Sequence, residues 1–409
     1  MNYVIIGNSA AGIAAAEAIR RADAAGKITV VSDEPYHTYG RPLISYYLLG
    51  ATDRQRMLYR PADFYEELGI GTRFGERAER IDPAKKKVFL RGGKSLSYDK
   101  LLVATGSRPF VPPAEGLDGV QNKFTFMTLD DALALEKVLT PASRVLIVGA
   151  GLIGLKCYEG IAERAGSVAI VDMADRVLSS VLDAEGAAIV QRRLESKGAR
   201  FYLSDCVEKY EDGVARLRGG ADIGFDILVL AVGVRPNVEL VKEAGGAVGR
   251  GIVTDAHRKT SLPDVYAAGD CCESTDELTG RQAVLAILPN ACAQGECAGK
   301  NMAGVPAETA DAFPLNAVGF FGLHVLTAGC RDGESYTERD GETYRKLFYA
   351  DGRLRGFILV GCPERAGIYT SLIREKTKLS DVDFELLKKQ PLLRAFSREA
   401  RAGKLAQEV

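Results

Sequence analysis

The stretch Gly149-Ala-Gly-Leu-Ile-Gly154 decides how the middle of this 409-residue sequence folds. It follows an apolar run at 144–148 and precedes a helix-forming segment that extends to about Ala165. A second apolar run occupies 168–171. This order predicts a strand, a glycine-rich turn, a helix and a second, parallel strand, which together form a βαβ unit.

Each glycine of a turn with this spacing has a physical role. The first permits the tight bend, the second lets the backbone approach a pyrophosphate, and the third lets the helix pack closely on the strand. The N-terminus of the helix then faces the phosphates. We therefore predict that this turn binds a dinucleotide. The predicted binding residues are Gly149, Gly151, Leu152, Ile153 and Gly154.

An acidic residue after the second strand indicates which dinucleotide binds. A carboxylate at Asp172 accepts a hydrogen bond from a ribose 2′-OH and repels a 2′-phosphate. Met173 and Ala174 follow it instead of basic residues, so we expect NADH to be preferred over NADPH. Arg176 leaves two interpretations open, because it could weaken that repulsion or simply begin a solvated helix.

A second unit of the same plan begins the chain with Gly7-Asn-Ser-Ala-Ala-Gly12, followed by a helix to about Ala24. Serine replaces the middle glycine, where its Cβ crowds a pyrophosphate but its hydroxyl can donate to one. Two acids follow the next strand, and the second is the favoured ribose ligand, although either could be a solvated turn residue. The predicted binding residues are Gly7, Ser9, Ala10, Ala11, Gly12, Asp33 and Glu34.

The remaining sequence contains two crossings and a hairpin. The runs at 101–109 and 227–236 are apolar strands broken by Gly and Arg-Pro, as expected where a chain leaves one domain for another. Runs at 344–349 and 354–360 flank Asp351-Gly352, which predicts a β-hairpin. We expect a separate α+β region here, closed by helices.

Composition excludes several classes of function. The net charge of −1, from 53 basic and 54 acidic side chains, gives no global field that favours nucleic acid or an anionic membrane. No apolar run reaches the length of a membrane span, and the first strand begins too early for a signal peptide, so we expect a cytoplasmic protein. The eight cysteines are then expected to be reduced thiols.

The run Val265-Tyr-Ala-Ala-Gly-Asp270, together with the two glycine-rich units, resembles the FAD-containing pyridine nucleotide-disulfide oxidoreductase superfamily. The resemblance covers essentially the whole chain. It implies that Gly269 and Asp270 bind FAD, with the carboxylate on the ribityl chain. It also implies that the turns at Thr105, Gly106 and Gly233 mark the crossings between domains.

The resemblance implies an α/β fold with two Rossmann-like, three-layer domains like those of glutathione reductase, plus a C-terminal α+β interface domain. The expected FAD-binding domain is discontinuous, and the NAD-binding domain lies within it along the chain. The predicted boundaries are 1–109 and 239–310 for the FAD domain, 110–238 for the NAD domain and 311–409 for the interface domain.

Within the superfamily, the segment from Pro35 to Ser45 looks like the flavin-side loop of rubredoxin reductases, ferredoxin reductases and assimilatory nitrite reductases. Arg41 and Pro42 would then lie at the FAD pyrophosphate. The segment 288–295, which contains Asn290, is similar to the helix whose N-terminus lies beneath the flavin. A plain surface helix is the alternative.

The cysteine positions argue against thiol chemistry at the flavin. Disulfide reductases, NADH peroxidases and water-forming oxidases carry cysteine soon after the first βαβ unit, whereas the first cysteine here is Cys157. His324 has a strand-like context and is interpreted as structural. We predict no metal site, because the later cysteines match no ligand spacing and are interpreted as core thiols. These are Cys271, Cys272, Cys292 and Cys297.

Two departures from the ferredoxin-reductase pattern are coupled. That branch usually pairs a lysine after the flavin-side loop with a glutamate after the NAD loop, and here Tyr46 and Lys156 stand at those positions. We hypothesise that Lys156 is catalytic: it approaches the flavin edge, stabilises the negative charge formed there and pairs with Glu159. A solvated helix lysine is the alternative.

The resemblance implies an NADH-dependent flavoenzyme that passes electrons to a small carrier protein, rubredoxin or ferredoxin. Three alternatives remain: a flavin subunit of a larger iron-sulfur complex exchanging electrons with NAD, a peroxide-forming NADH oxidase, and a non-catalytic binding module. The basic segment from Lys388 could dock an acidic carrier or pack on the interface domain. The oligomeric state stays open.

Overall fold

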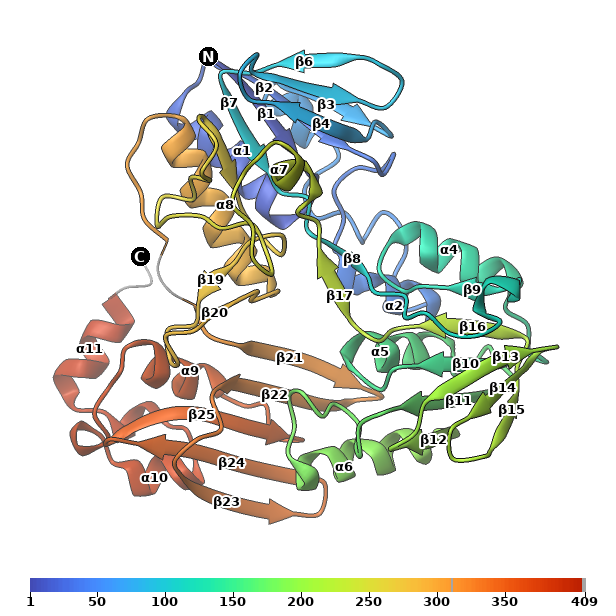
Figure 1. The fold of residues 1–409 in the computed structure, drawn as a ribbon. Coiled ribbons are helices and arrows are strands. Elements are labelled where there is room, and N and C mark those ends of the chain that lie inside the picture. Colours follow the sequence, from blue (N-terminus) through green and yellow to red (C-terminus); the bar gives the residue numbers. More distant parts are fainter. Residues whose placement is uncertain (310–311, 407–409) are drawn as a thin grey trace. The chain divides into compact units, whose positions relative to one another are not determined.

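The computed structural model describes residues 1–309 and 312–406 and divides the chain into two compact units (Figure 1). The predicted boundary at 310/311 lies outside the described residues, and the three-domain division stays a prediction. The first unit contains Met1–Val111, Thr125–Lys137 and Gly233–Ala312, and the second contains Pro112–Phe124, Val138–Val232 and the chain from Phe313 onwards.

A five-stranded parallel sheet with the order β18-β7-β1-β2-β3 forms the centre of the first unit. Its middle strand is apolar on both faces, and Ile5 lies beside Val30 on one neighbour and Leu102 on the other. The strands are β1 (Asn2–Ile6), β2 (Lys27–Ser32), β3 (Ile70–Phe74), β7 (Lys100–Val103) and β18 (Val265–Ala267).

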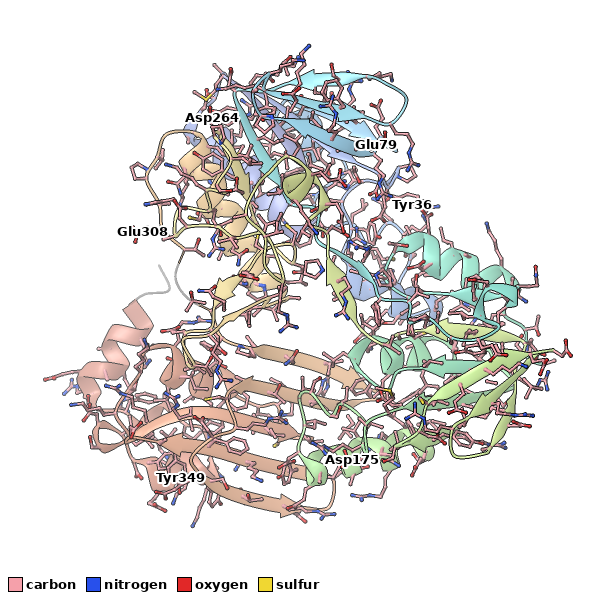
Figure 2. The ribbon with its side chains drawn as sticks, viewed as in Figure 1. Tyr36, Glu79, Asp175, Asp264, Glu308 and Tyr349 are labelled. Atoms are coloured by element: carbon pink, nitrogen blue, oxygen red, sulfur yellow. The ribbon has the colours of Figure 1, made fainter. Side chains whose placement is uncertain are left out.

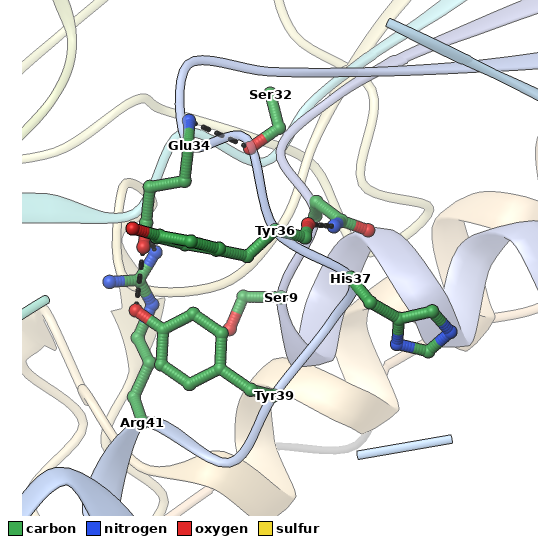
Figure 3. A pocket seen from close by; sticks show the side chains of 8 residues that line it. Ser9, Ser32, Glu34, Tyr36, His37, Tyr39 and Arg41 are labelled. Carbon is green, nitrogen blue, oxygen red and sulfur yellow. Dashed lines mark hydrogen bonds and ion pairs between the residues drawn. The ribbon is translucent and has the colours of Figure 1, made fainter. Parts of the chain in front are cut away.

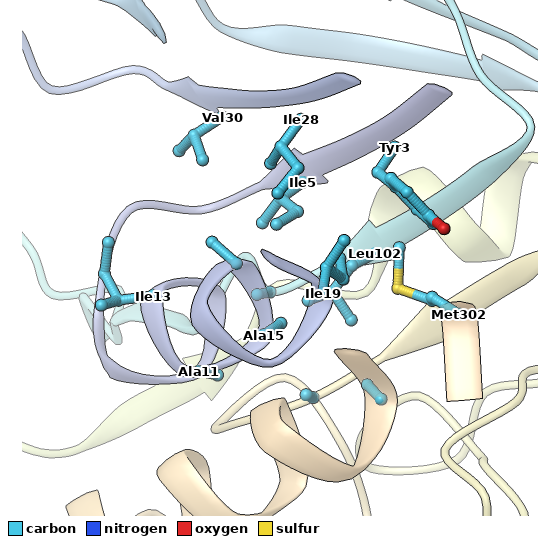
Figure 4. Close-up of a cluster of buried hydrophobic side chains, with 14 of the residues drawn as sticks. Tyr3, Ile5, Ala11, Ile13, Ala15, Ile19, Ile28, Val30, Leu102 and Met302 are labelled. Carbon is cyan, nitrogen blue, oxygen red and sulfur yellow. The ribbon is translucent and has the colours of Figure 1, made fainter. Parts of the chain in front are cut away.

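Two helices, α1 (Ala10–Ala22) and α8 (Leu288–Met302), pack against each other below one face of this sheet (Figure 4). Small residues let their backbones meet. A Cβ added to Gly295 of α8 would overlap the carbonyl oxygen of Ala11 in α1. Glycine and alanine at this contact therefore set how closely the two helices approach.

The opposite face of the sheet is covered by an antiparallel three-stranded sheet, so the unit has three layers. Ile81, Val88 and Leu90 of this small sheet are buried in one cluster with Val4 and Val31. The other elements of the unit are β4 (Ala78–Asp82), β5 (Lys87–Leu90), β6 (Ser95–Ser97), η1 (Arg41–Leu43), α2 (Ile44–Leu48), α3 (Phe64–Glu67), β8 (Ser107–Pro109), α4 (Leu129–Val138), β17 (Val234–Pro236), α7 (Glu239–Glu243), β19 (Ser274–Thr275) and β20 (Gln282–Ala283).

The second unit repeats the plan with a parallel sheet of order β12-β11-β10-β16-β9. One face buries Leu146 and Leu228 against Leu217 of a three-stranded antiparallel sheet. The elements are η2 (Leu117–Gly119), β9 (Lys123–Phe124), β10 (Arg144–Val148), α5 (Leu152–Ile161), β11 (Ser167–Asp172), α6 (Ala184–Glu195), β12 (Ala199–Leu203), β13 (Val207–Glu211), β14 (Val214–Leu217), β15 (Asp222–Gly224) and β16 (Ile227–Leu230).

The second unit also contains an antiparallel sheet of order β21-β22-β25-β24-β23. The predicted hairpin is confirmed: β24 pairs with β25, and Asp351 and Gly352 both have positive φ, as a type I′ turn requires. His324 lies in β22, as expected. The elements are β21 (Leu315–Phe320), β22 (Leu323–Gly329), β23 (Glu334–Asp340), β24 (Thr343–Ala350), β25 (Arg353–Val360), α9 (Ala366–Arg374), η3 (Leu379–Asp381), α10 (Phe384–Lys389), η4 (Leu393–Ala395) and α11 (Arg398–Ala406).

Both predicted βαβ helices end earlier than expected from the sequence. α1 stops at Ala22 because the carboxylate of Asp23 accepts from the backbone N–H groups of Ala25 and Gly26, which turns the chain. α5 ends at Ile161, whose carbonyl closes a turn instead of the helix continuing to residue 165. Within the described residues, we find no helix with the length and apolarity to cross a bilayer.

The contact between α1 and α8 predicts that Gly295→Ala destabilises the protein. The new Cβ must push the helices apart, which typically costs about 1–3 kcal/mol in a well-packed core. Gly367→Ala in α9 is the matched control, because its Cβ would meet open space and alanine stabilises helices by roughly 0.5–1 kcal/mol. Denaturant unfolding measures both, and equal midpoints for the two variants would contradict the prediction.

Candidate functional site

The N-terminal glycine-rich turn joins β1 to α1 in the first unit. Gly7 has φ of 125° and lies so close to β7 that an added Cβ would overlap the carbonyl oxygen of Ala104. A Cβ on Gly12 would overlap the carbonyl oxygen of Gly7, so helix and strand meet closely there. Ser9 stands before the first helical residue, and its hydroxyl makes no capping bond to the helix.

A pocket opens at this turn and extends along the segment after β2 (Figure 3). Glu34 lines it, whereas Asp33 is exposed and outside its lining. The Glu34 carboxylate pairs with the Arg41 guanidinium and accepts a hydrogen bond of 2.6 Å from the Tyr39 hydroxyl. The lining residues are Asn8, Ser9, Ser32, Glu34, Tyr36, His37, Tyr39 and Arg41.

The same segment is attached to the region at the start of α4. The Leu129 N–H donates to the Tyr39 hydroxyl at 2.9 Å, and the Tyr36 hydroxyl donates to Asp130 at 2.5 Å. Arg41 also donates to the carbonyl of Met127. These bonds place Thr125–Lys137 in the first unit and fix the side chains that line the pocket.

Asp270 lies at the end of β18 beside the same turn. Gly269 has φ of 86°, and a Cβ added to it would lie only 3.1 Å from the Cβ of Ala11, so β18 leads its acid to the start of α1. Burial raises the pKa of Asp270, and the nearby Arg41 partly offsets this rise. The described residues supply no hydrogen bond to its carboxylate, which leaves the group suited to accept bonds from ligand hydroxyls.

One residue whose role was not predicted from the sequence, Gln294, holds this arrangement. Gln294 of α8 is fully buried, accepts from the Gly269 N–H at 2.8 Å and donates to Ser274 at 2.6 Å. Gln294 thereby ties α8 to the Gly269–Asp270 turn. Asn290, which was predicted, instead donates to the carbonyl of Leu285 and fixes the chain entering α8.

Thr105, at the predicted crossing between domains, is hydrogen-bonded to Asn237, which was not predicted from the sequence. The Thr105 hydroxyl donates to the backbone carbonyl of Asn237 at 2.8 Å, and the Asn237 side chain donates back to the Thr105 carbonyl at 2.8 Å. Gly106 and Gly233 have φ of 62° and 116°, conformations that favour glycine. The two crossing strands, β8 and β17, pair with each other.

The first unit therefore fits the FAD that the sequence implies. Its turn offers backbone N–H groups at the start of α1 for a diphosphate. Arg41 adds a positive charge to a pocket that Glu34 also lines, and Pro42 follows Arg41 within η1. A half-buried carboxylate at Asp270, whose pKa is raised by desolvation, matches the hydroxyl groups of a ribityl chain.

The second glycine-rich turn, between β10 and α5, has the geometry expected from its sequence. Gly149 has φ of 114°, and an added Cβ would overlap the carbonyl oxygen of Ala231. A Cβ on Gly154 would overlap the carbonyl oxygen of Gly149. Gly151 instead faces open space, with nothing within 4 Å of an added Cβ. Leu152 and Ile153 open the helix.

Asp172 joins the end of β11 to this turn. Its carboxylate accepts from the Ala150 N–H at 2.6 Å and from the Ala174 N–H at 2.8 Å. The acid is thus fixed beside the glycine-rich turn with lone pairs left for a ribose. Arg176, whose role the sequence left open, is paired with Asp175 at 2.6 Å.

Lys156 and Glu159 lie in α5 and meet the turn between β21 and β22. They form an ion pair, and the Lys156 ammonium also donates to the carbonyl of Gly319 at 3.2 Å. The other Glu159 oxygen accepts from the Phe321 N–H at 2.6 Å. The Glu159 side chain is buried, and its hydrogen bond holds the Phe321 backbone, which has a φ of 47°.

The four cysteines singled out by the sequence occupy apolar or hydrogen-bonded positions. Cys271 and Cys272 are buried with sulfur atoms 3.7 Å apart, and both are free thiols. Cys292 contacts the Tyr59 hydroxyl, and Cys297 donates to the Ala307 carbonyl. Over 1–309 and 312–406, no three His, Cys, Asp or Glu residues are grouped as metal ligands would be.

These features are those expected of a protein that binds two dinucleotides, each at a glycine-rich βαβ turn with a following acid. A family model described as pyridine nucleotide-disulphide oxidoreductase matches residues 1–295. The chain belongs to this family. It is an oxidoreductase that depends on FAD and a pyridine nucleotide.

Individual relatives agree with this assignment. The chain is 31% identical to NADH-dependent phenylglyoxylate dehydrogenase subunit epsilon of Aromatoleum evansii, over 92% of each chain. It is 32% identical to the ferredoxin--NAD(+) reductase component of 3-phenylpropionate/cinnamic acid dioxygenase of Photorhabdus laumondii, covering 74% of this chain and 78% of the relative. The chain spans about half the length of the nitrate and nitrite reductase relatives it also matches.

A solved structure shares the fold. The putidaredoxin reductase of a covalent complex with putidaredoxin has a TM-score of 0.87 at 24% identity, covering 96% of this chain and 98% of that chain. At this identity the likeness concerns the fold alone. The prediction of an α/β protein with Rossmann-like domains is confirmed.

The burial of Asp270 predicts opposite effects of Asp270→Asn on stability and on FAD affinity. Because burial raises the pKa, the ionised carboxylate opposes folding of the FAD-free protein. This destabilisation is absent below the ordinary Asp pKa of 3.8. It grows as the pH rises from there towards the raised pKa of the folded protein, where Asp270 ionises as well. Asparagine should therefore stabilise the FAD-free protein at pH 7 and lose this advantage in acid.

The same substitution should weaken FAD binding about 10- to 100-fold, because hydrogen bonds to charged groups contribute roughly 1.5–3 kcal/mol. Thermal unfolding and flavin fluorescence measure the two effects, with the exposed Asp63→Asn as the control. Unchanged FAD affinity would remove Asp270 from the site.

The flavin-edge role of Lys156 stays a prediction, and two variants separate it from a structural role. Lys156→Met should slow flavin reduction by NADH on the order of tenfold or more while NADH binding persists. Glu159→Gln keeps the ammonium but breaks the buried pair. Equal losses of rate in both variants, measured by anaerobic stopped flow, would indicate that the pair only supports the Phe321 turn.

Proposed function

We propose that this protein is an FAD-dependent NADH:acceptor oxidoreductase that passes electrons to a small carrier protein of the rubredoxin or ferredoxin type. The observation that carries the proposal is the pair of glycine-rich turns with their acids. One turn is combined with the half-buried Asp270, and the other with Asp172. The first cysteine of the chain is Cys157, so the region after the first βαβ unit contains no redox-active cysteine pair.

FAD, when bound, accepts two electrons from NADH and can release them singly to a carrier. The residues that would hold it lie in the first unit. Arg41 would face the diphosphate at the Gly7–Gly12 turn, Glu34 would face the adenosine ribose, and Asp270 would accept from the ribityl hydroxyls. The protein contributes position and charge at these atoms.

Asp172 would select NADH over NADPH. Its carboxylate is fixed by two backbone N–H groups and can accept from a 2′-OH, but it would repel a 2′-phosphate. The open space before Gly151 leaves room for the diphosphate against the start of α5.

A C-terminal stretch with more exposed basic than acidic side chains supports an acidic carrier as the partner. Seven Arg and Lys side chains are exposed between residues 365 and 398, against four exposed acids in the same stretch. Part of the tail also packs, since Lys404 pairs with Glu375 at 2.7 Å and lies over Phe396. The exposed basic residues are Arg365, Arg374, Lys376, Lys378, Lys389, Arg394 and Arg398.

A second function is favoured by one comparison. The relative from Aromatoleum evansii is a dehydrogenase subunit and matches this chain over 92% of both lengths. By this likeness, the chain would be a flavin subunit that exchanges electrons between NAD and an iron-sulfur partner. Copurification of further subunits at fixed stoichiometry distinguishes this function from a free-standing reductase. For both functions we propose that the protein acts in the cytoplasm.

An anaerobic titration of the yellow protein tests the proposal. NADH should bleach the flavin at lower concentrations than NADPH, and oxidised rubredoxin or ferredoxin should restore the colour. Docking on the exposed basic residues of the C-terminal stretch predicts that carrier reduction slows as salt is raised, because exposed charges are screened within about 8–10 Å at moderate ionic strength. Reoxidation only by air would indicate a peroxide-forming oxidase. Failure to bleach would contradict the reductase.

A further inference from the structure

The segment after Asp172 runs back to the glycine-rich turn of the second unit. Asp172 accepts from the Ala150 N–H, and the Leu178 N–H donates to the Ala150 carbonyl at 2.9 Å. Val177 and Leu178 are buried, which anchors the far end of the segment. Residues 173–176 therefore lie beside the place where the ribose of a bound nucleotide would meet Asp172.

One positive charge lies in this segment. Arg176 is the only basic residue between Asp172 and Leu182. Its guanidinium pairs with Asp175 at 2.6 Å and approaches the carbonyl of Leu182 at 3.5 Å. An arginine near the ribose-binding acid is the group that accepts the 2′-phosphate in NADP-dependent proteins of this fold class. Here both observed partners of Arg176 are acceptors within the segment itself.

We propose that Asp175 is a second determinant of NADH preference, because it holds Arg176 in an ion pair and neutralises the cation that a 2′-phosphate would require. Asp175 lies on the segment between β11 and α6 (Figure 2). The inference rests on the proposed binding of NADH at the Gly149–Gly154 turn. Asp172 would repel a 2′-phosphate directly, and Asp175 would act indirectly through its ion pair with Arg176.

The exposure of the pair sets the size of the effect. The Asp175 side chain is 69% exposed and that of Arg176 is 32% exposed, so solvent screens their interaction. Releasing Arg176 should therefore strengthen binding of a 2′-phosphate by about three- to tenfold, and less at high salt. A nucleotide without the 2′-phosphate offers Arg176 no comparable partner.

The experiment measures the dissociation constants of NAD⁺ and NADP⁺ for the FAD-loaded protein and for Asp175→Asn, which removes the charge and keeps the size. We expect the ratio of NADP⁺ to NAD⁺ affinity to rise about three- to tenfold at low salt. Asp175→Asn combined with Arg176→Ala should return the ratio to the original value. Asp222→Asn is the matched control, because Asp222 pairs with Arg216 at 3.0 Å on a separate three-stranded sheet.

The outcomes separate this inference from the proposed function. Failure of the unaltered protein to bind NAD⁺ would contradict the proposed function itself. Normal preference for NAD⁺ in the unaltered protein, with the same ratio in Asp175→Asn, would overturn only the role of Asp175. A rise that persists when Arg176 is removed would also overturn it, because the gain would then come from the lost acid alone.

Discussion

The close approach of α1 and α8 is the constraint on which the predicted FAD site depends. Gly295 admits the Ala11 carbonyl where any side chain would overlap it, so the two helices lie backbone to backbone. α8 carries Gln294, which binds the Gly269 N–H and so fixes the turn that presents Asp270. The acid, the glycine-rich turn and the start of α8 are thus positioned by one contact between small residues.

The two units differ in the residue at the middle position of the glycine-rich turn. In the second unit Gly151 leaves open space before α5, as a close backbone approach to a diphosphate requires. In the first unit Ser9 adds a side chain at the matching position, and the pocket there also holds the Glu34–Arg41 pair. Pairing the half-buried Arg41 with Glu34 keeps a positive charge available for a ligand without leaving it unpaired.

The structural features that could be predicted from the sequence are local or periodic ones. Both βαβ units, the Asp351-Gly352 hairpin and the acid after β18 follow from patterns of a few residues, and the structure contains all of them. The bonds between Thr105 and Asn237, which are 132 residues apart, leave no mark in any local pattern. The hydrogen bond from Gly269 to Gln294 was missed for the same reason.

The roles of charged residues were also harder to predict than their positions. The spacing of Lys156 and Glu159 on one helix face predicted their ion pair, which the structure contains. It did not predict that Glu159 would also hold the Phe321 backbone, because that partner comes from a sheet far along the chain. Arg176 was ambiguous because its partner Asp175 is adjacent in sequence and could equally have pointed away.

A crystal structure with FAD and NAD⁺ tests the central claim most directly, since it shows which turn holds which dinucleotide. The account predicts the FAD diphosphate at Gly7–Gly12 with its ribityl chain at Asp270, and the NAD⁺ diphosphate at Gly149–Gly154 with its ribose at Asp172. Exchanged positions, or FAD bound without contact to Asp270, would contradict it.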